Sequence, residues 1–86
     1  MRDVWEGIYG ARAVIAECTG RNPNVFYEIG IAHTLGKPVI LTTQTTEDVP
    51  SDLRNIRYIH YQYTPPGMKL FETTLQKTLS ETLRLA

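Results

Sequence analysis

The chain has 86 residues, and its nine Lys plus Arg residues balance nine Asp plus Glu residues, so the formal net charge is zero. This length allows one small domain over residues 1–86, and a hydrophobic content of 42% is enough for a packed core. A balanced charge with no local cluster of basic residues argues against nucleic acid as a partner, because such binding depends on a positive surface.

Cys18 is the single cysteine of the chain, which excludes an internal disulfide and any zinc site built from several cysteines. A lone thiol suits a reducing compartment, so we expect a cytoplasmic protein. No stretch approaches the roughly 20 apolar residues that span a bilayer, and the first residues lack the apolar core of a signal peptide. We therefore expect no membrane insertion and no export.

The first two predicted elements are a short helix and a buried strand. Apolar side chains spaced by three and four residues mark one helical face at Val4, Trp5, Ile8, Tyr9 and Ala11. The apolar run Ala13–Ala16 follows, bounded by Arg12 and Glu17, and predicts a strand that is buried on both faces.

The clearest helix start in the sequence is Asn22-Pro23. Asn22 can cap the helix, and Pro23 fits the first helical position without losing a needed N–H group. We expect the helix to run from Pro23 to about Leu35. It ends there because Gly36 can adopt the left-handed conformation that closes a helix, and the next residues are Lys37 and Pro38.

A second strand is predicted at Val39–Leu41, followed by a loop from Thr42 to Pro50 that is too polar to be core. One helical turn is expected at Ser51–Arg54. The segment Ile56–Tyr61 alternates Ile and Tyr with polar residues and predicts a third, half-exposed strand.

The last predicted element is an amphipathic helix after the chain break at Pro65-Pro66-Gly67. Its apolar stripe recurs every four residues, at Phe71, Leu75, Leu79 and Leu83, and is expected to lie in the core. Helices alternating with short apolar strands predict an α/β fold with a parallel sheet and helices on its faces.

In an open parallel sheet, ligands bind beyond the carboxyl ends of the strands. Two segments reach that edge, namely Glu17–Glu28 and Thr42–Pro50. Glu28 is a candidate catalytic carboxylate on the second turn of its helix, although the residue taken alone somewhat favours the interpretation as a solvated helix residue. Gly30 in the same helix indicates a close approach of the backbone, either to the sheet or to a ligand.

Motifs for other chemistries are missing. No two histidines are four residues apart, no second cysteine accompanies Cys18, and neither a Gly-x-Ser-x-Gly turn nor a phosphate-binding loop occurs. We therefore expect no metal and no cofactor. Cys18 is interpreted as a small core residue, His33 as a structural residue near a helix end, and His60 as a strand residue without neighbours suited to metal binding.

The run NPNVFYEIGIAHTLGKPVIL, from Asn22 to Leu41, together with AVIAECTGR, from Ala13 to Arg21, resembles the nucleoside 2-deoxyribosyltransferase-like superfamily. The resemblance extends weakly to Asp52-Leu53-Arg54 and the Ile56–Tyr61 strand. It is more distant to TIR-type domains, which cleave NAD. The resemblance implies a three-layer, flavodoxin-like or Rossmann-like fold that here lacks the first strand and helix of the family.

The resemblance also implies the roles of individual residues. Glu28 corresponds to the glutamate that attacks the anomeric carbon of a deoxyribonucleoside, chemistry that suits a carboxylate. The substrate-binding candidates that accompany it are Glu17, Thr19, Gly20, Asn22, Asn24 and Tyr27. Glu17 stands where similar sequences usually have Asp, and Asn22 stands where characterised transferases tend to have an acidic residue.

In this family a further strand lies beside the one predicted at Ala13–Ala16, so its absence leaves an open apolar edge. Exposed edges invite pairing with another chain, and we expect a homo-oligomer through this edge. The leading hypothesis is nucleoside or nucleotide recognition with cleavage or transfer of the N-glycosidic bond by Glu28. The alternative is a catalytically inactive module that binds a nucleotide or self-associates.

Overall fold

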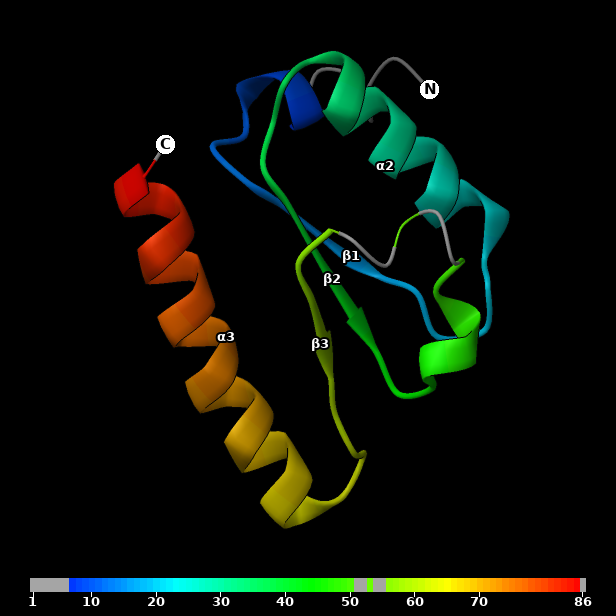
Figure 1. The fold of residues 1–86 in the computed structure, drawn as a ribbon, viewed down its shortest axis with the longest axis vertical. Helices are drawn as coiled ribbons and strands as arrows, with labels where there is room; N and C mark the ends of the chain where they lie inside the picture. The colour runs from blue at the N-terminus through cyan, green and yellow to red at the C-terminus, as the bar shows by residue number, and fades with distance from the viewer. Residues whose placement is uncertain (1–6, 51–52, 54–55, 86) are drawn as a thin grey trace.

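A computed structural model describes residues 7–50, 53 and 56–85 of the chain (Figure 1). Three parallel strands form one sheet in the order β1-β2-β3: β1 is Val14–Glu17, β2 is Val39–Thr43 and β3 is Tyr58–His60. Around the sheet lie a helical segment at residues 7–10, helix α2 at Pro23–Thr34, a short 3-10 helix η1 at Thr46–Asp48 and helix α3 at Pro65–Leu85. The structure is therefore a small α/β fold with an open parallel sheet, as the order of elements predicted.

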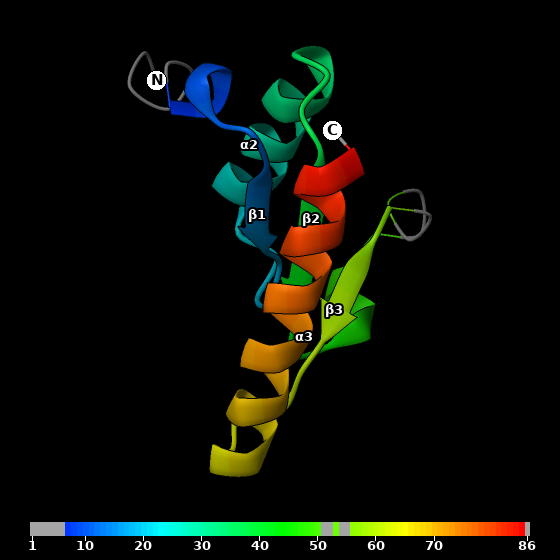
Figure 2. The same cartoon turned by 90° about the vertical axis from the view of Figure 1, so that its left-hand side faces the viewer.

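The two long helices lie on opposite sides of the sheet (Figure 2). Ile29 and Ala32 of α2 pack in one core with Ala16 of β1 and Leu41 of β2. On the other side, the ring of Tyr61, just after β3, stacks on Phe71 of α3 with centroids 4.3 Å apart. None of the helices in the described part of the chain is long and apolar enough to cross a membrane.

Both ends of α2 follow the sequence prediction. Asn22 precedes the helix in an extended conformation, and its side chain accepts a hydrogen bond from the Asn24 amide at 2.9 Å. The helix ends at Thr34, and Gly36 takes a positive φ of 70° that few other residues adopt without strain. These local signals need no tertiary context, so the sequence predicted the helix ends within one residue.

Several expectations about burial are wrong. Strand β1 lies one residue later than predicted. It is not buried on both faces, because Ile15 is 46% exposed. Strand β2 extends two residues beyond Leu41. Thr42 and Thr43 are both buried, and the hydrogen bonds of their hydroxyls offset the cost of burying a polar group. Val49 is fully buried although it lies in the polar loop.

Helix α3 begins at Pro65, where a break was expected, because proline is tolerated in the first helical turn. Its apolar stripe at Phe71, Leu75, Leu79 and Leu83 is only half-buried, so the expectation that it forms core is wrong in degree. Strand β3 is shorter than predicted but half-exposed as expected, with Ile59 buried between two exposed residues.

Gly30 does not approach the sheet, as one interpretation of the sequence required. A Cβ atom added at Gly30 would meet nothing within 4 Å outside its own helix, and the residue is exposed. Residues 7–10 are helical, which agrees with the predicted first helix, while Val4 and Trp5 lie outside the described residues. Of the turn expected at 51–54, only Leu53 is described, in a 3-10 conformation.

Candidate functional site

The carboxyl ends of the three strands meet at one edge of the sheet, because the strands are parallel and in register. Glu17 of β1 is aligned with Thr42 of β2, and Thr42 is aligned with Ile59 of β3. Side chains alternate along a strand, so Tyr61 lies on the same face as Ile59 and reaches the row of Glu17 and Thr42. A carboxylate, an alcohol and a phenol from three separate strands are brought together there.

Glu17 is held by three hydrogen bonds at this edge. Its Oε2 atom accepts one bond from the Thr42 hydroxyl and one from the Tyr61 hydroxyl, each 2.7 Å long. Its Oε1 atom accepts a third bond, of 2.8 Å, from the Thr19 amide. A carboxylate offers about four acceptor positions, and these bonds take up at least three of them.

The hydrogen bonds also set the ionisation of this cluster. Partial burial of the carboxylate raises the pKa of Glu17, but the hydrogen bonds from Thr19, Thr42 and Tyr61 together outweigh it, and the net pKa is lowered. Burial and the bond to Glu17 raise the pKa of Tyr61, which therefore stays a donor. The cluster is thus a negatively charged acceptor at neutral pH.

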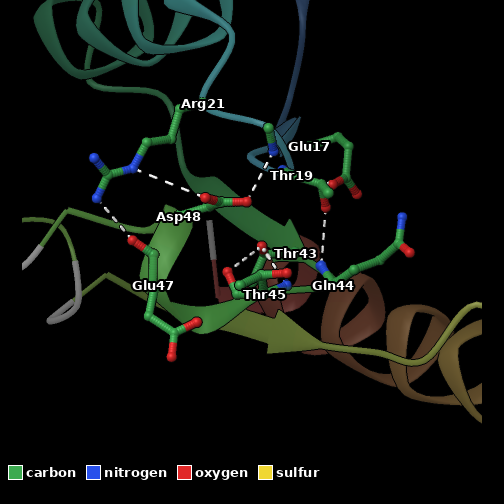
Figure 3. Close-up of polar contacts among 9 residues, drawn as sticks. Glu17, Thr19, Arg21, Thr43, Gln44, Thr45, Glu47 and Asp48 are labelled. Atoms are coloured by element: carbon green, nitrogen blue, oxygen red, sulfur yellow. Dashed lines mark hydrogen bonds and ion pairs between the residues drawn. The ribbon is translucent and has the colours of Figure 1, made fainter.

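A second set of contacts joins the turn after β1 to η1 (Figure 3). The Gly20 amide donates to Asp48 at 2.8 Å, and the Arg21 guanidinium lies 3.8 Å from the same carboxylate. Arg21 also donates to the Glu47 carbonyl at 2.8 Å. Gly20 and Arg21 have positive φ values of 83° and 55°, which aim this turn at η1. The Gly20 amide is thus already bonded to Asp48 and is not available to a bound anion.

Gln44 links the two sets through its backbone. Its amide donates to the Thr19 hydroxyl at 2.9 Å (Figure 3), and its carbonyl lies 2.9 Å from Nε2 of His60. Its side-chain amide approaches the Tyr61 hydroxyl at 3.5 Å. The loops after all three strands are therefore cross-connected, which orders the edge without any ligand.

Cys18 lies directly behind this edge and has no exposed surface. Burial raises the pKa of its thiol, and the negative charges of Glu17 and Asp48 raise it further. A protonated, inaccessible thiol is a core group, as the sequence analysis expected.

The structure brings together only some of the predicted substrate-binding residues. Glu17, Thr19 and Gly20 belong to the clusters at the sheet edge, whereas Asn22 is engaged in capping α2 and Asn24 is exposed. Tyr27 is 53% exposed and lies on the face of α2 opposite the buried Ile29 and Ala32, away from the sheet.

Glu28 lies on the flank of α2, between its buried and outer faces. The residue is half-buried, and its carboxylate makes no hydrogen bond or ion pair with any residue that the structure describes. The two candidate glutamates thus differ, because Glu17 is held by three donors and Glu28 is unengaged.

The sequence placed Arg21, Thr42 and Asp48 in the two segments expected at this edge but did not mark them as site residues, and it placed Tyr61 in the third predicted strand. Their approach to one edge could be predicted, because all parallel strands end at the same edge. The hydrogen bonds between these residues could not be predicted, because they depend on the strand register and on the path of η1. Among the residues that the structure describes, no group of three or more His, Cys, Asp or Glu side chains could hold a metal ion.

Comparison with known proteins found no family model, no curated protein and no solved structure that matches the chain.

Proposed function

We propose that this chain is a cytoplasmic nucleoside-recognition domain with a flavodoxin-like arrangement of layers, in which Glu28 is the candidate nucleophile for cleavage or transfer of an N-glycosidic bond. The observation that supports recognition most directly is the Glu17 carboxylate, held in place by Thr19, Thr42 and Tyr61 at the carboxyl edge of the sheet. A charged, solvent-exposed acceptor suits a sugar hydroxyl, which is a good donor.

The charge of the edge favours a nucleoside over a nucleotide. Glu17, Glu47 and Asp48 bring three carboxylates to these loops, and Arg21 is already engaged by Asp48 and the Glu47 carbonyl. A phosphate would therefore meet repulsion, and Asp48 competes with it for the Gly20 amide.

Glu28 suits the chemical step because its carboxylate has no competing partner among the described residues. In the proposed reaction, one carboxylate oxygen of Glu28 bonds to the anomeric carbon while the bond from that carbon to the base nitrogen breaks. The base leaves with the electron pair and takes a proton from solvent. An acceptor base or water then displaces the carboxylate and regenerates it.

The experiment uses deoxynucleosides with a free acceptor base, and NAD in a separate arm. We expect base exchange or base release with the wild type and its loss in Glu28→Gln, while Glu72→Gln on the exposed face of α3 retains it. Binding is measured in parallel by titration calorimetry, where a nucleoside is expected to bind more tightly than its 5′-monophosphate. Binding without turnover would identify an inactive module, and tighter binding of the monophosphate would contradict the charge argument.

Self-association is a second candidate, because β1 is an edge strand in the described sheet (Figure 2). The amides of Val14 and Cys18 bond to the β2 side, so by alternation Ile15 directs its backbone groups to the open edge. Antiparallel pairing about a two-fold axis at Ile15 would join these groups and place two exposed Ile15 side chains in contact.

Light scattering tests this candidate. We expect a dimer for the wild type and a monomer for Ile15→Lys, whereas Tyr27→Lys on the outer face of α2 keeps the dimer. A wild-type monomer at about 100 μM would reject the candidate, since stable dimers have lower dissociation constants.

A further inference from the structure

A groove runs along the open edge of β3, on the side of the sheet opposite β1. Two open cavities of about 340 Å³ and 500 Å³ share the lining residues Ile59, His60 and Thr74, so they adjoin as a shallow channel between β3 and α3. The channel is separate from the Glu17 cluster except at Tyr61, whose ring lines one end of it.

The strand that forms one wall has unpaired backbone groups. The Arg57 carbonyl accepts from Leu41 and the Tyr61 amide donates to Thr43, each at 3.0 Å, so these residues face β2. Alternation along the strand directs the amides and carbonyls of Tyr58 and His60 to the open side. No described strand pairs with β3 there. The edge therefore offers main-chain donors and acceptors to an added strand.

The helix that forms the other wall is held alongside β3 at two points. Phe71 stacks on Tyr61, and eleven residues later Thr82 accepts a hydrogen bond of 3.4 Å from Arg57. Eleven helical residues rise about 16 Å, which equals the length of roughly five strand residues. The wall thus runs along the whole edge and needs no rearrangement to accept an extended segment.

Side chains give the groove an apolar end and a positive end. Leu70 is 68% exposed and lies with Phe71 at the first end. At the other end Arg57 and Glu81 pair at 3.7 Å, whereas Lys77 makes no ion pair with any described residue. The unpaired lysine favours an acidic group in a bound molecule, because opposite charges attract across an interface.

We propose that this groove binds an extended peptide of a partner protein, with apolar side chains toward one end and acidic side chains toward the other, as an added strand on β3. A strand between an edge strand and a helix obtains affinity from main-chain hydrogen bonds and selectivity from the side-chain sites of the wall. A second copy of this chain is a poorer occupant, because two-fold pairing at β3 would place two α3 helices, each with an unpaired Lys77, against one another.

The probes are two fluorescein-labelled peptides of eight residues, one with four valines followed by four glutamates and one with the reverse order, both blocked at their ends. The two orders cover parallel and antiparallel pairing with β3, and binding is followed by fluorescence anisotropy. We expect saturable binding of at least one peptide to the wild type, and its loss for the same peptide with alternate amides methylated, because methylation removes the donors that pair with β3. The same peptides with lysine in place of glutamate are expected to bind at least about fivefold more weakly.

Two pairs of variants locate the site. Lys77→Glu is expected to weaken binding of the valine–glutamate peptides by about fivefold or more and to favour the lysine peptides, whereas Lys69→Glu, on the same helix outside the groove, leaves both unchanged. Thr74→Trp fills the channel and is expected to abolish binding, whereas the exposed Thr73→Trp does not. Circular dichroism verifies that each variant is folded.

Three results would overturn the proposal. If the methylated peptide bound as tightly as the parent peptide, pairing as an added strand on β3 would be ruled out. The absence of any anisotropy change up to about 1 mM protein would rule out the binding site, since even weak peptide recognition has a dissociation constant below that concentration. A wild-type dimer that Thr74→Trp converts to a monomer would assign the groove to a second copy.

Discussion

The Tyr61 hydroxyl donates a hydrogen bond of 2.7 Å to the Glu17 carboxylate across 44 residues of chain. The same tyrosine stacks its ring on Phe71. One residue therefore couples the end of β1, the end of β3 and the start of α3, and it joins the candidate site to the packing of the last helix.

Removing this hydroxyl is expected to destabilise the fold. Tyr61→Phe keeps the stacked ring but loses a bond to a charged acceptor, which costs about 1 to 2 kcal/mol of the free energy of unfolding. The pKa of Glu17 is expected to rise, because one of its donors is gone. Urea unfolding and an NMR titration of Glu17 measure the two effects. Tyr63→Phe, at a tyrosine that is 75% exposed, provides the control, and an equal loss of stability there would contradict the role of the bond.

The stability of the protein is expected to depend on pH through Glu17. Its pKa is lower in the folded chain than in the unfolded chain, so protonation favours unfolding. The stabilisation is complete above the ordinary glutamate pKa of about 4.3 and is lost as the pH falls through the lower folded value. Glu17→Gln is expected to be less stable than the wild type at pH 7, with a difference that narrows in acid.

Denaturant unfolding at several pH values between 7 and 3 measures that difference. Glu72→Gln removes a carboxylate from an exposed position on α3 and serves as the comparison. A gap between wild type and Glu17→Gln that stays constant down to pH 3 would be inconsistent with a hydrogen-bonded Glu17 carboxylate.

Cys18 is expected to resist thiol reagents in the native protein. The side chain has no exposed surface, and burial together with Glu17 and Asp48 raises the pKa of the thiol. Both effects remove the reactive thiolate. Labelling with a disulfide reagent should be slow without denaturant and complete within seconds in urea. Equally fast labelling in both conditions would show that the edge opens readily.

Two glycines are expected to respond oppositely to alanine. Gly30→Ala should stabilise the protein by about 0.5 to 1 kcal/mol, because the site is helical and a Cβ atom has open space. Gly36→Ala should destabilise it by about 1 kcal/mol or more, because φ is 70° at that position. Thermal unfolding distinguishes the two variants. A destabilising Gly30→Ala would indicate that residue 30 contacts a second molecule, since it has open space within the chain.

Local chemistry allowed several elements to be predicted from the sequence. The Asn22 cap, Pro23 and Gly36 specify α2 through backbone conformations and hydrogen bonds within a few residues. The short apolar runs mark β1 and β2, of which only β2 is buried along its whole length. The alternation of elements then leads to a parallel sheet, and with it to the expectation that the loops after β1 and β2 share one edge.

Tertiary structure alone decided what happens at that edge. The sequence marked Glu17 as a candidate, but its donors Thr42 and Tyr61 lie 25 and 44 residues away and reach it through strand register. The exposure of Ile15 and the half-burial of the α3 stripe likewise depend on which faces the other elements cover. A hydrophobic pattern shows which residues favour burial, whereas the position of the other elements decides which of them are buried.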